Sequence, residues 1–247
     1  MKTGTEALET WVPLGGFRLD HRKGKTPEGE FSTTDWLVPV LAYDGVAPGY
    51  PCTEQPCLHR VLATCPHDQV IRLASMYGLL TASGKVARAG DLPPEPVETW
   101  HREIRALRNA TALWDAIAGN DDAALRRALP QHQAAKRKDL LGLAREHLAW
   151  QVTEKVAGGR LELIAPDGGP FAIRHRPVRL IDAIWQQFAG EIAGRMTAAR
   201  CPAPGCGRWF PRSVGRSDRQ FCSHACQMRA WRNGSERSGG EPPSNLP

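Results

Sequence analysis

Four cysteines near the C-terminal end restrict the possible folds of this chain more than any other feature. They are Cys201, Cys206, Cys222 and Cys226, arranged as Cys-x4-Cys-x15-Cys-x3-Cys. Two cysteine pairs separated by a loop of this length are typical of a zinc site, because Zn²⁺ prefers four soft ligands in a tetrahedron. A catalytic zinc keeps one position open, whereas here cysteines can fill all of them. The spacing therefore predicts one structural zinc ion.

The residues around these cysteines suit a small zinc-binding module. The prolines and the glycine between Cys201 and Cys206 favour a tight turn that brings the first pair together. Ser223 is placed to cap a helix that begins at the second pair. Phe210 and Phe221 flank the intervening loop and are candidates for a small core. A knuckle, a hairpin and a helix in this order predict a treble-clef-like finger.

The charge of this region differs from that of the rest of the chain. The chain carries a net charge of +6, but the segment from Arg195 to Arg232 holds eight arginines and a single acid, Asp218, which gives +7. Coding bias would explain arginine in place of lysine, but it would not explain the near absence of acids here. A small basic module predicts an anionic partner, most often a nucleic acid. The candidate contacts are Arg208, Arg212, Arg216, Arg219, Arg229 and Arg232.

Upstream of the module the sequence is mainly helical. Apolar residues recur at spacings of four and three from Val97 to Gly119, which places them on one face of a helix. They are Trp100, Ile104, Leu107, Thr111, Trp114 and Ile117. The pattern further predicts a strand over 36–41 and a hairpin of 160–164 with 171–174. It also predicts helices over 70–80, 120–129 and 134–156, and a last helix from Val178. Asn120 is placed to cap the helix over 120–129.

The sequence therefore predicts an α+β fold in three parts. Residues 1–198 form a mainly α-helical domain with a β-hairpin, although residues 1–95 are poorly defined because glycine and proline interrupt the pattern. Residues 199–233 form the zinc finger. Residues 234–247 are rich in serine, glycine and proline and are expected to be a disordered tail.

The finger resembles that of the CGNR zinc-finger family of bacterial proteins. The matching residues are Cys201-x4-Cys206-Gly207, the aromatic Phe210, and Arg219-Gln220-Phe221-Cys222-Ser223. The second pair departs from the family pattern, with three intervening residues where the family has four. Cys226-Gln227-Met228-Arg229 stands where the family has Cys-Gly-Asn-Arg.

Members of that family carry an α-rich domain, known as ABATE, before the finger. The segment from Leu113 to Gly119, the hairpin that follows and the helix from Leu180 to Ala193 are similar to that domain. The resemblance implies an ABATE-like domain over residues 1–198. It also implies a transcription regulator that binds DNA through the finger and senses or binds an effector, a small molecule or a protein, through the upstream domain.

A second group of cysteines and histidines lies upstream, at Cys52, Cys57, His59, Cys65 and His67. As a metal site it would combine Cys-x4-Cys with Cys-x-His. The alternative is that its cysteines belong to the core and its histidines to the surface of a proline-rich loop. The sequence leaves both interpretations open and favours the second.

Common signatures of catalysis and membrane insertion are missing from the sequence. It contains no Gly-x-Gly-x-x-Gly, Walker loop, His-Glu-x-x-His or Gly-x-Ser-x-Gly, so we do not expect an enzyme. No run approaches the roughly 18 apolar residues of a membrane span, and the start, MKTGTEALET, does not look like a signal peptide. We therefore expect a cytoplasmic protein that is not attached to a membrane.

Two functions fit these features. The first is a zinc-finger nucleic-acid-binding protein, in particular a bacterial DNA-binding transcription regulator with an upstream sensing or interaction domain. The second is a protein-interaction module without nucleic-acid binding, in which zinc replaces a hydrophobic core too small to fold alone.

Overall fold

A computed structural model covers the whole chain and describes residues 10–13, 16–25, 31–40, 46–49, 55–82, 88–134, 139–164, 172–213 and 219–238. The chain divides into two compact units, Met1–Ala189 and Gly190–Pro247. Helices and small antiparallel sheets occur together, so the predicted α+β class is confirmed. None of the described helices is both long and apolar enough to cross a bilayer.

Helix α4, Val97–Gly119, is the central helix of the first unit. Its predicted apolar face is confirmed, because Trp100, Ile104 and Leu107 are fully buried. The predicted cap of the next helix is wrong by one residue. Asn120 has a φ of 49° and ends α4 in the left-handed conformation, whereas Asp121 accepts hydrogen bonds from the first amides of α5, Asp122–Ala128.

The helix predicted over 134–156 is in fact two elements. The first is the short helix α6, Gln131–Ala134, and the second is the longer helix α7, Leu140–Val156. The start of α7 is set by Asp139, whose carboxylate accepts a hydrogen bond of 2.8 Å from the Gly142 amide.

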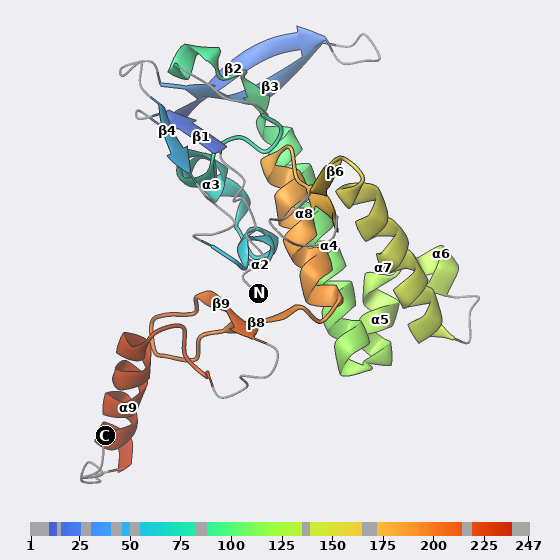
Figure 1. Cartoon of the computed structure of the whole chain (residues 1–247), viewed down its shortest axis with the longest axis vertical. Helices are drawn as coiled ribbons and strands as arrows, with labels where there is room; N and C mark the ends of the chain where they lie inside the picture. Colours follow the sequence, from blue (N-terminus) through green and yellow to red (C-terminus); the bar gives the residue numbers. More distant parts are fainter. Residues whose placement is uncertain are drawn as a thin grey trace. The chain divides into compact units, whose positions relative to one another are not determined.

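Three helices of this unit are joined by one buried acid. Glu103 on α4 accepts hydrogen bonds of 2.8 Å at both carboxylate oxygens from Lys155 Nζ on α7. Trp185 on α8, Leu180–Ile192, donates its indole N–H to the same carboxylate at 3.3 Å. Lys155 also lies over the Trp185 ring, 5.6 Å from its centre. Figure 1 shows α4, α7 and α8 running alongside one another.

The N-terminal part contains more strands than the sequence predicts. Strand β2, Phe17–Lys25, pairs with β3, Phe31–Pro39, which also pairs with the short β5, Glu95–Pro96. Strands β1, Thr10–Pro13, and β4, Val46–Gly49, form a separate antiparallel pair. Only the strand near Trp36 is confirmed as predicted, within β3.

Short helices lie between β4 and β5 in the chain. Two are α-helices, α2 (Leu58–Ala63) and α3 (Val70–Tyr77). Two are 3-10 turns, η1 (His67–Gln69) and η2 (Ala89–Asp91). The predicted helix over 70–80 is confirmed as α3, which ends at Gly78 because this residue has a φ of 88°.

The predicted hairpin is confirmed as β6, Arg160–Ile164, paired with β7, Ala172–Arg176. Leu163 pairs with Ile173 in this register, and both side chains are largely exposed. The turn between the strands lies outside the described residues.

Among its described residues, the second unit contains the last turn of α8, two strands and a helix. Strand β8, Met196–Arg200, pairs with β9, Trp209–Ser213, so the segment that leads into Cys201 is a strand that the sequence analysis missed. Helix α9, His224–Ser238, extends past residue 233 into the expected disordered tail. A single Gly234 costs a helix only about 1 kcal/mol, and glutamate and arginine follow it, so the helix continues. Residues 239–247 lie outside the described part of the chain.

Candidate metal centre

The first cysteine pair sits on a tight turn between β8 and β9. The Cys201 amide donates to the Arg208 carbonyl at 2.9 Å, which closes the loop where the strands meet. Within the loop the Cys206 amide donates to the Ala203 carbonyl at 3.0 Å. Gly205 and Gly207 have φ values of 70° and 57°, a region that suits glycine far better than other residues. The sequence thus builds a knuckle that turns both sulfurs inward.

The second pair lies at the start of α9. Ser223 Oγ accepts a hydrogen bond from the Cys226 amide at 3.3 Å, as a helix-capping serine does. Cys222 precedes the helix and Cys226 lies in its first turn, four residues on, so both sulfurs point to the same side. The predicted role of Ser223 as a helix cap is consistent with this geometry.

The structure brings the four sulfurs together. Their Sγ atoms all lie within 4.8 Å of one another, and this group could hold one metal ion. Cys222 Sγ is 3.5 Å from Cys226 Sγ and 3.6 Å from Cys206 Sγ. Sulfurs bound at about 2.3 Å to a tetrahedral zinc would be separated by about 3.8 Å, which is close to these distances. Cys201 and Cys226 are buried, and the other two sulfurs are half-buried.

Electrostatics explains why this cluster needs a cation to become fully ionised. The hydrogen bond from the Ser223 hydroxyl lowers the pKa of Cys226 to about 7. Burial, followed by contacts with the neighbouring sulfurs, raises the pKa of Cys222 to about 12. Adjacent thiols resist joint ionisation because each negative charge disfavours the next, and a bound divalent cation removes that penalty.

A small apolar core supports the cluster. Phe210 on β9 is buried, and Phe221 packs against the same group of residues as Cys201 and Cys226. The sequence prediction that Phe210 and Phe221 form the core of the module is therefore confirmed. Because so few apolar side chains take part, this core alone is too small for a stable fold.

The candidate arginines differ in what they contact. Arg219 donates to the carbonyls of Phe221, at 3.1 Å, and Cys222, and its guanidinium lies over the Phe210 ring. Arg212 donates to the Arg219 carbonyl at 3.0 Å. These arginines therefore hold the loop before α9 in place.

The remaining arginines leave more of their donors available. Arg229 makes a long hydrogen bond of 3.4 Å to the Pro204 carbonyl. The side chains of Arg208 and Arg232 are exposed and make no hydrogen bond or ion pair with another described residue. Arg216 lies outside the described residues. Arg208 and Arg229 both line a hollow of about 280 Å³, together with Cys206, Cys222 and Cys226.

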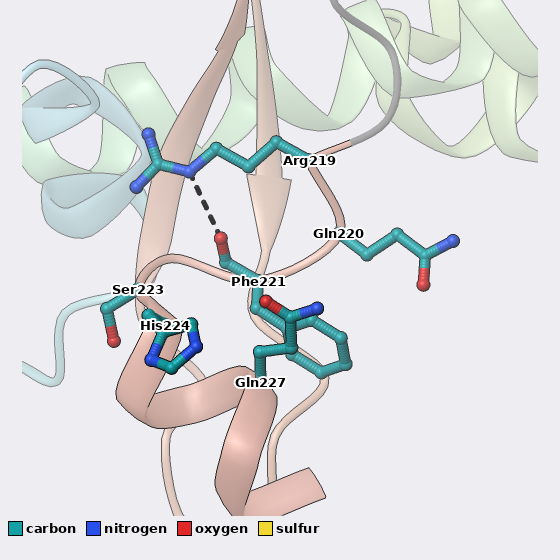
Figure 2. Close-up of a pocket in the computed structure, with 6 residues that line it drawn as sticks. All are labelled: Arg219, Gln220, Phe221, Ser223, His224 and Gln227. Atoms are coloured by element: carbon teal, nitrogen blue, oxygen red, sulfur yellow. Dashed lines mark hydrogen bonds between the residues drawn. The ribbon is translucent and has the colours of Figure 1, made fainter. Parts of the chain in front are cut away.

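A second hollow, of about 410 Å³, lies at the start of α9. Figure 2 shows its six lining residues, four from the segment before the helix and two, His224 and Gln227, from the helix itself. They are Arg219, Gln220, Phe221, Ser223, His224 and Gln227. The sequence does not predict this hollow, because it assigns other roles to Arg219, Phe221 and Ser223 and gives no sign that they come together with His224 and Gln227.

The upstream cysteines and histidines do not form a comparable cluster. Among described residues the C-terminal group is the only one that gathers three or more candidate metal ligands. Cys57 and Cys65 are buried, and His59 is buried with its ring beside Phe188. His67 is exposed and stacks on another histidine. Cys57, Cys65 and His67 fit the interpretation as core cysteines and surface histidines, which is wrong for the buried His59. Cys52 lies outside the described residues.

The chain matches no model of a known protein family and no curated protein. The functional interpretation therefore rests on the residues and geometry of the two units themselves.

Proposed function

We propose that this protein is a zinc-dependent nucleic-acid-binding protein, and more specifically a bacterial transcription regulator whose C-terminal finger binds DNA. The observation that carries the proposal is the four-sulfur cluster within a small unit that is rich in arginine. Four cysteines and no oxygen ligands favour zinc over hard cations such as magnesium or calcium. Zinc has a structural role here, since the cysteines occupy every position of a tetrahedron.

The distribution of charge supports a polyanionic partner. Asp218 is the only acid from Gly194 to Ser235, so few carboxylates in this segment oppose a phosphate backbone. Arg208, Arg229 and Arg232 are exposed, and each can donate several hydrogen bonds to phosphate oxygens. In this proposal Arg212 and Arg219 chiefly shape the finger, and the first unit senses or binds an effector.

A gel-shift assay tests the proposal directly. The full chain, loaded with zinc, is mixed with a random-sequence duplex at low and at moderate salt, and the assay is repeated after chelation. We expect a shift that weakens with salt and disappears with the metal. A chain that holds zinc but does not shift duplex DNA at low salt would instead be a zinc-stabilised protein-interaction module.

A further inference from the structure

The hollow at the start of α9 presents amide and imidazole groups that have no partner among the described residues. The side chains of Gln220, His224 and Gln227 are exposed and make no hydrogen bond with any other described residue. Ser223, between them, is the helix cap. The hollow therefore offers several unused donors and acceptors within about 410 Å³.

The hollow carries little charge even though it lies in a basic module. Arg219 is its only arginine, and that guanidinium donates to the carbonyls of Phe221 and Cys222. Figure 2 shows the bond from Arg219 to the Phe221 carbonyl. A lone phosphate would be held better by Arg208 and Arg229, which line the other hollow. With a single arginine, which already donates to two of the finger's own carbonyls, this hollow is better suited to a neutral ligand with hydrogen-bonding edges.

The two hollows share Ser223 at the helix start, but Gln227 lines only this hollow and Arg229 lines only the other. Successive residues of an α-helix are 100° apart, so Gln227 and Arg229 point about 200° from each other. Cys226 and Ala230 face the module's own core and Met228 is half-buried, whereas His224, Gln227 and Arg229 are exposed. A helix of this kind can present amides to base edges while its arginines reach the backbone.

We propose that this hollow reads base edges in the major groove of duplex DNA, and that its glutamines select adenine. A glutamine carboxamide can accept from adenine N6 and donate to adenine N7 at the same time, and no other base edge in the major groove offers that pair. Gln227 is the principal reader, Gln220 and His224 assist it, and the Phe221 ring supplies an apolar wall. The inference rests on the proposed function and adds sequence recognition to it.

A selection experiment with the full zinc-loaded chain tests the inference. The probe is a library of duplexes with a randomised central segment, bound and amplified over several rounds. The wild type should enrich sites with a fixed adenine, and Gln227→Ala should lower the preference at that position by roughly 5- to 150-fold. The salt dependence of binding should not change in this variant, because an uncharged glutamine releases no counterions from the phosphates.

Matched variants separate base reading from other effects. Gln131→Ala replaces an exposed glutamine of the first unit and should leave the preference intact. Arg229→Ala should weaken binding to all sequences alike and reduce the salt dependence. Zinc content and hydrogen exchange of the finger should match the wild type in every variant, which shows that folding is preserved.

The outcomes distinguish the inference from the proposed function. If the wild type binds duplex DNA but enriches no adenine, or if the preference survives Gln220→Ala/Gln227→Ala, the inference is overturned and the proposed function stands. If the wild type binds no duplex at all, both are overturned.

Discussion

Cys222 Sγ and Cys226 Sγ lie 3.5 Å apart, although Cys222 precedes helix α9 and Cys226 belongs to its first turn. Ser223 makes this approach possible, because its hydroxyl fixes the point at which the helix begins. The knuckle brings the other two sulfurs to the same place. A candidate metal centre thus follows from one turn and one helix start, each set by a few residues.

The first prediction concerns metal content. Purified protein should contain about one zinc per chain, and Cys226→Ser should abolish high-affinity binding because three ligands remain. Elemental analysis of wild type and variant measures this. Cys57→Ala is the control, since Cys57 is buried outside the cluster and its loss should leave the zinc in place. A second zinc that disappears with Cys57 would show that the upstream group also binds metal.

The second prediction concerns folding. Metal binding in a unit with so small a core is coupled to folding, so chelation should expose the amides of residues 199–233. The helices α4, α7 and α8 should keep their protection, because Glu103 and the apolar faces of these helices do not depend on the cluster. Hydrogen exchange with and without a chelator measures both regions. Loss of protection in α4 would mean that the two units fold as one.

The third prediction separates structural from binding arginines. Arg219→Ala removes donors to two loop carbonyls and should weaken zinc binding roughly fivefold, which corresponds to about 1 kcal/mol for hydrogen bonds in an exposed setting. Arg208→Ala should leave zinc affinity unchanged and weaken DNA binding. Competition with a chromogenic chelator measures zinc affinity in both. Equal zinc affinities in the two variants would contradict the role assigned to Arg219.

The fourth prediction concerns Glu95, which is 2% exposed and whose Oε1 has no partner among the described residues. Burial raises the pKa of Glu95 to about 7. A raised pKa means that the folded state binds the proton more tightly, so stability is greatest below the unfolded pKa, 4.5, and falls as pH rises towards about 7. The free energy of unfolding should fall by up to about 3 kcal/mol over this range.

Replacing that carboxyl by an amide tests the sign of this dependence. Glu95→Gln cannot ionise, so its stability should change less between pH 5 and pH 8 than that of the wild type. Urea unfolding, monitored by the helical circular dichroism signal, gives the free energy of unfolding of each protein at the two pH values. Identical pH dependence in the two proteins would rule out Glu95 as its source.

The sequence predicts well those elements whose cause is local. The apolar residues of α4 repeat every three or four positions, which is enough to predict the helix and its buried face. The spacing of the four cysteines is likewise enough to predict the metal centre. Asn120 and Asp121 are harder to separate, because both residue types cap helices and only the backbone shows that Asn120 ends the previous one.

Features that depend on distant contacts are not predictable in this way. Strand β2 pairs with β3 through residues that alternate weakly in polarity, and β8 becomes a strand because β9 lies beside it. The hollow around Gln227 exists only because the loop from Arg219 folds back onto the start of α9. Arg212 and Arg219 likewise differ from the other arginines only because folding brings backbone carbonyls within reach of their guanidinium groups.

The most direct test of the central claim is the salt dependence of duplex DNA binding by wild type and by Arg229→Ala/Arg232→Ala. Both proteins should hold the same amount of zinc, since neither residue is in the cluster. We predict that the wild type binds duplex DNA with an affinity that falls steeply with salt. The double variant should bind more weakly, with a salt slope smaller by about two units, because each lost phosphate contact removes about one. Equal binding by the two proteins, or no binding above background by either at low salt, would contradict the account and leave a zinc-stabilised interaction module in its place.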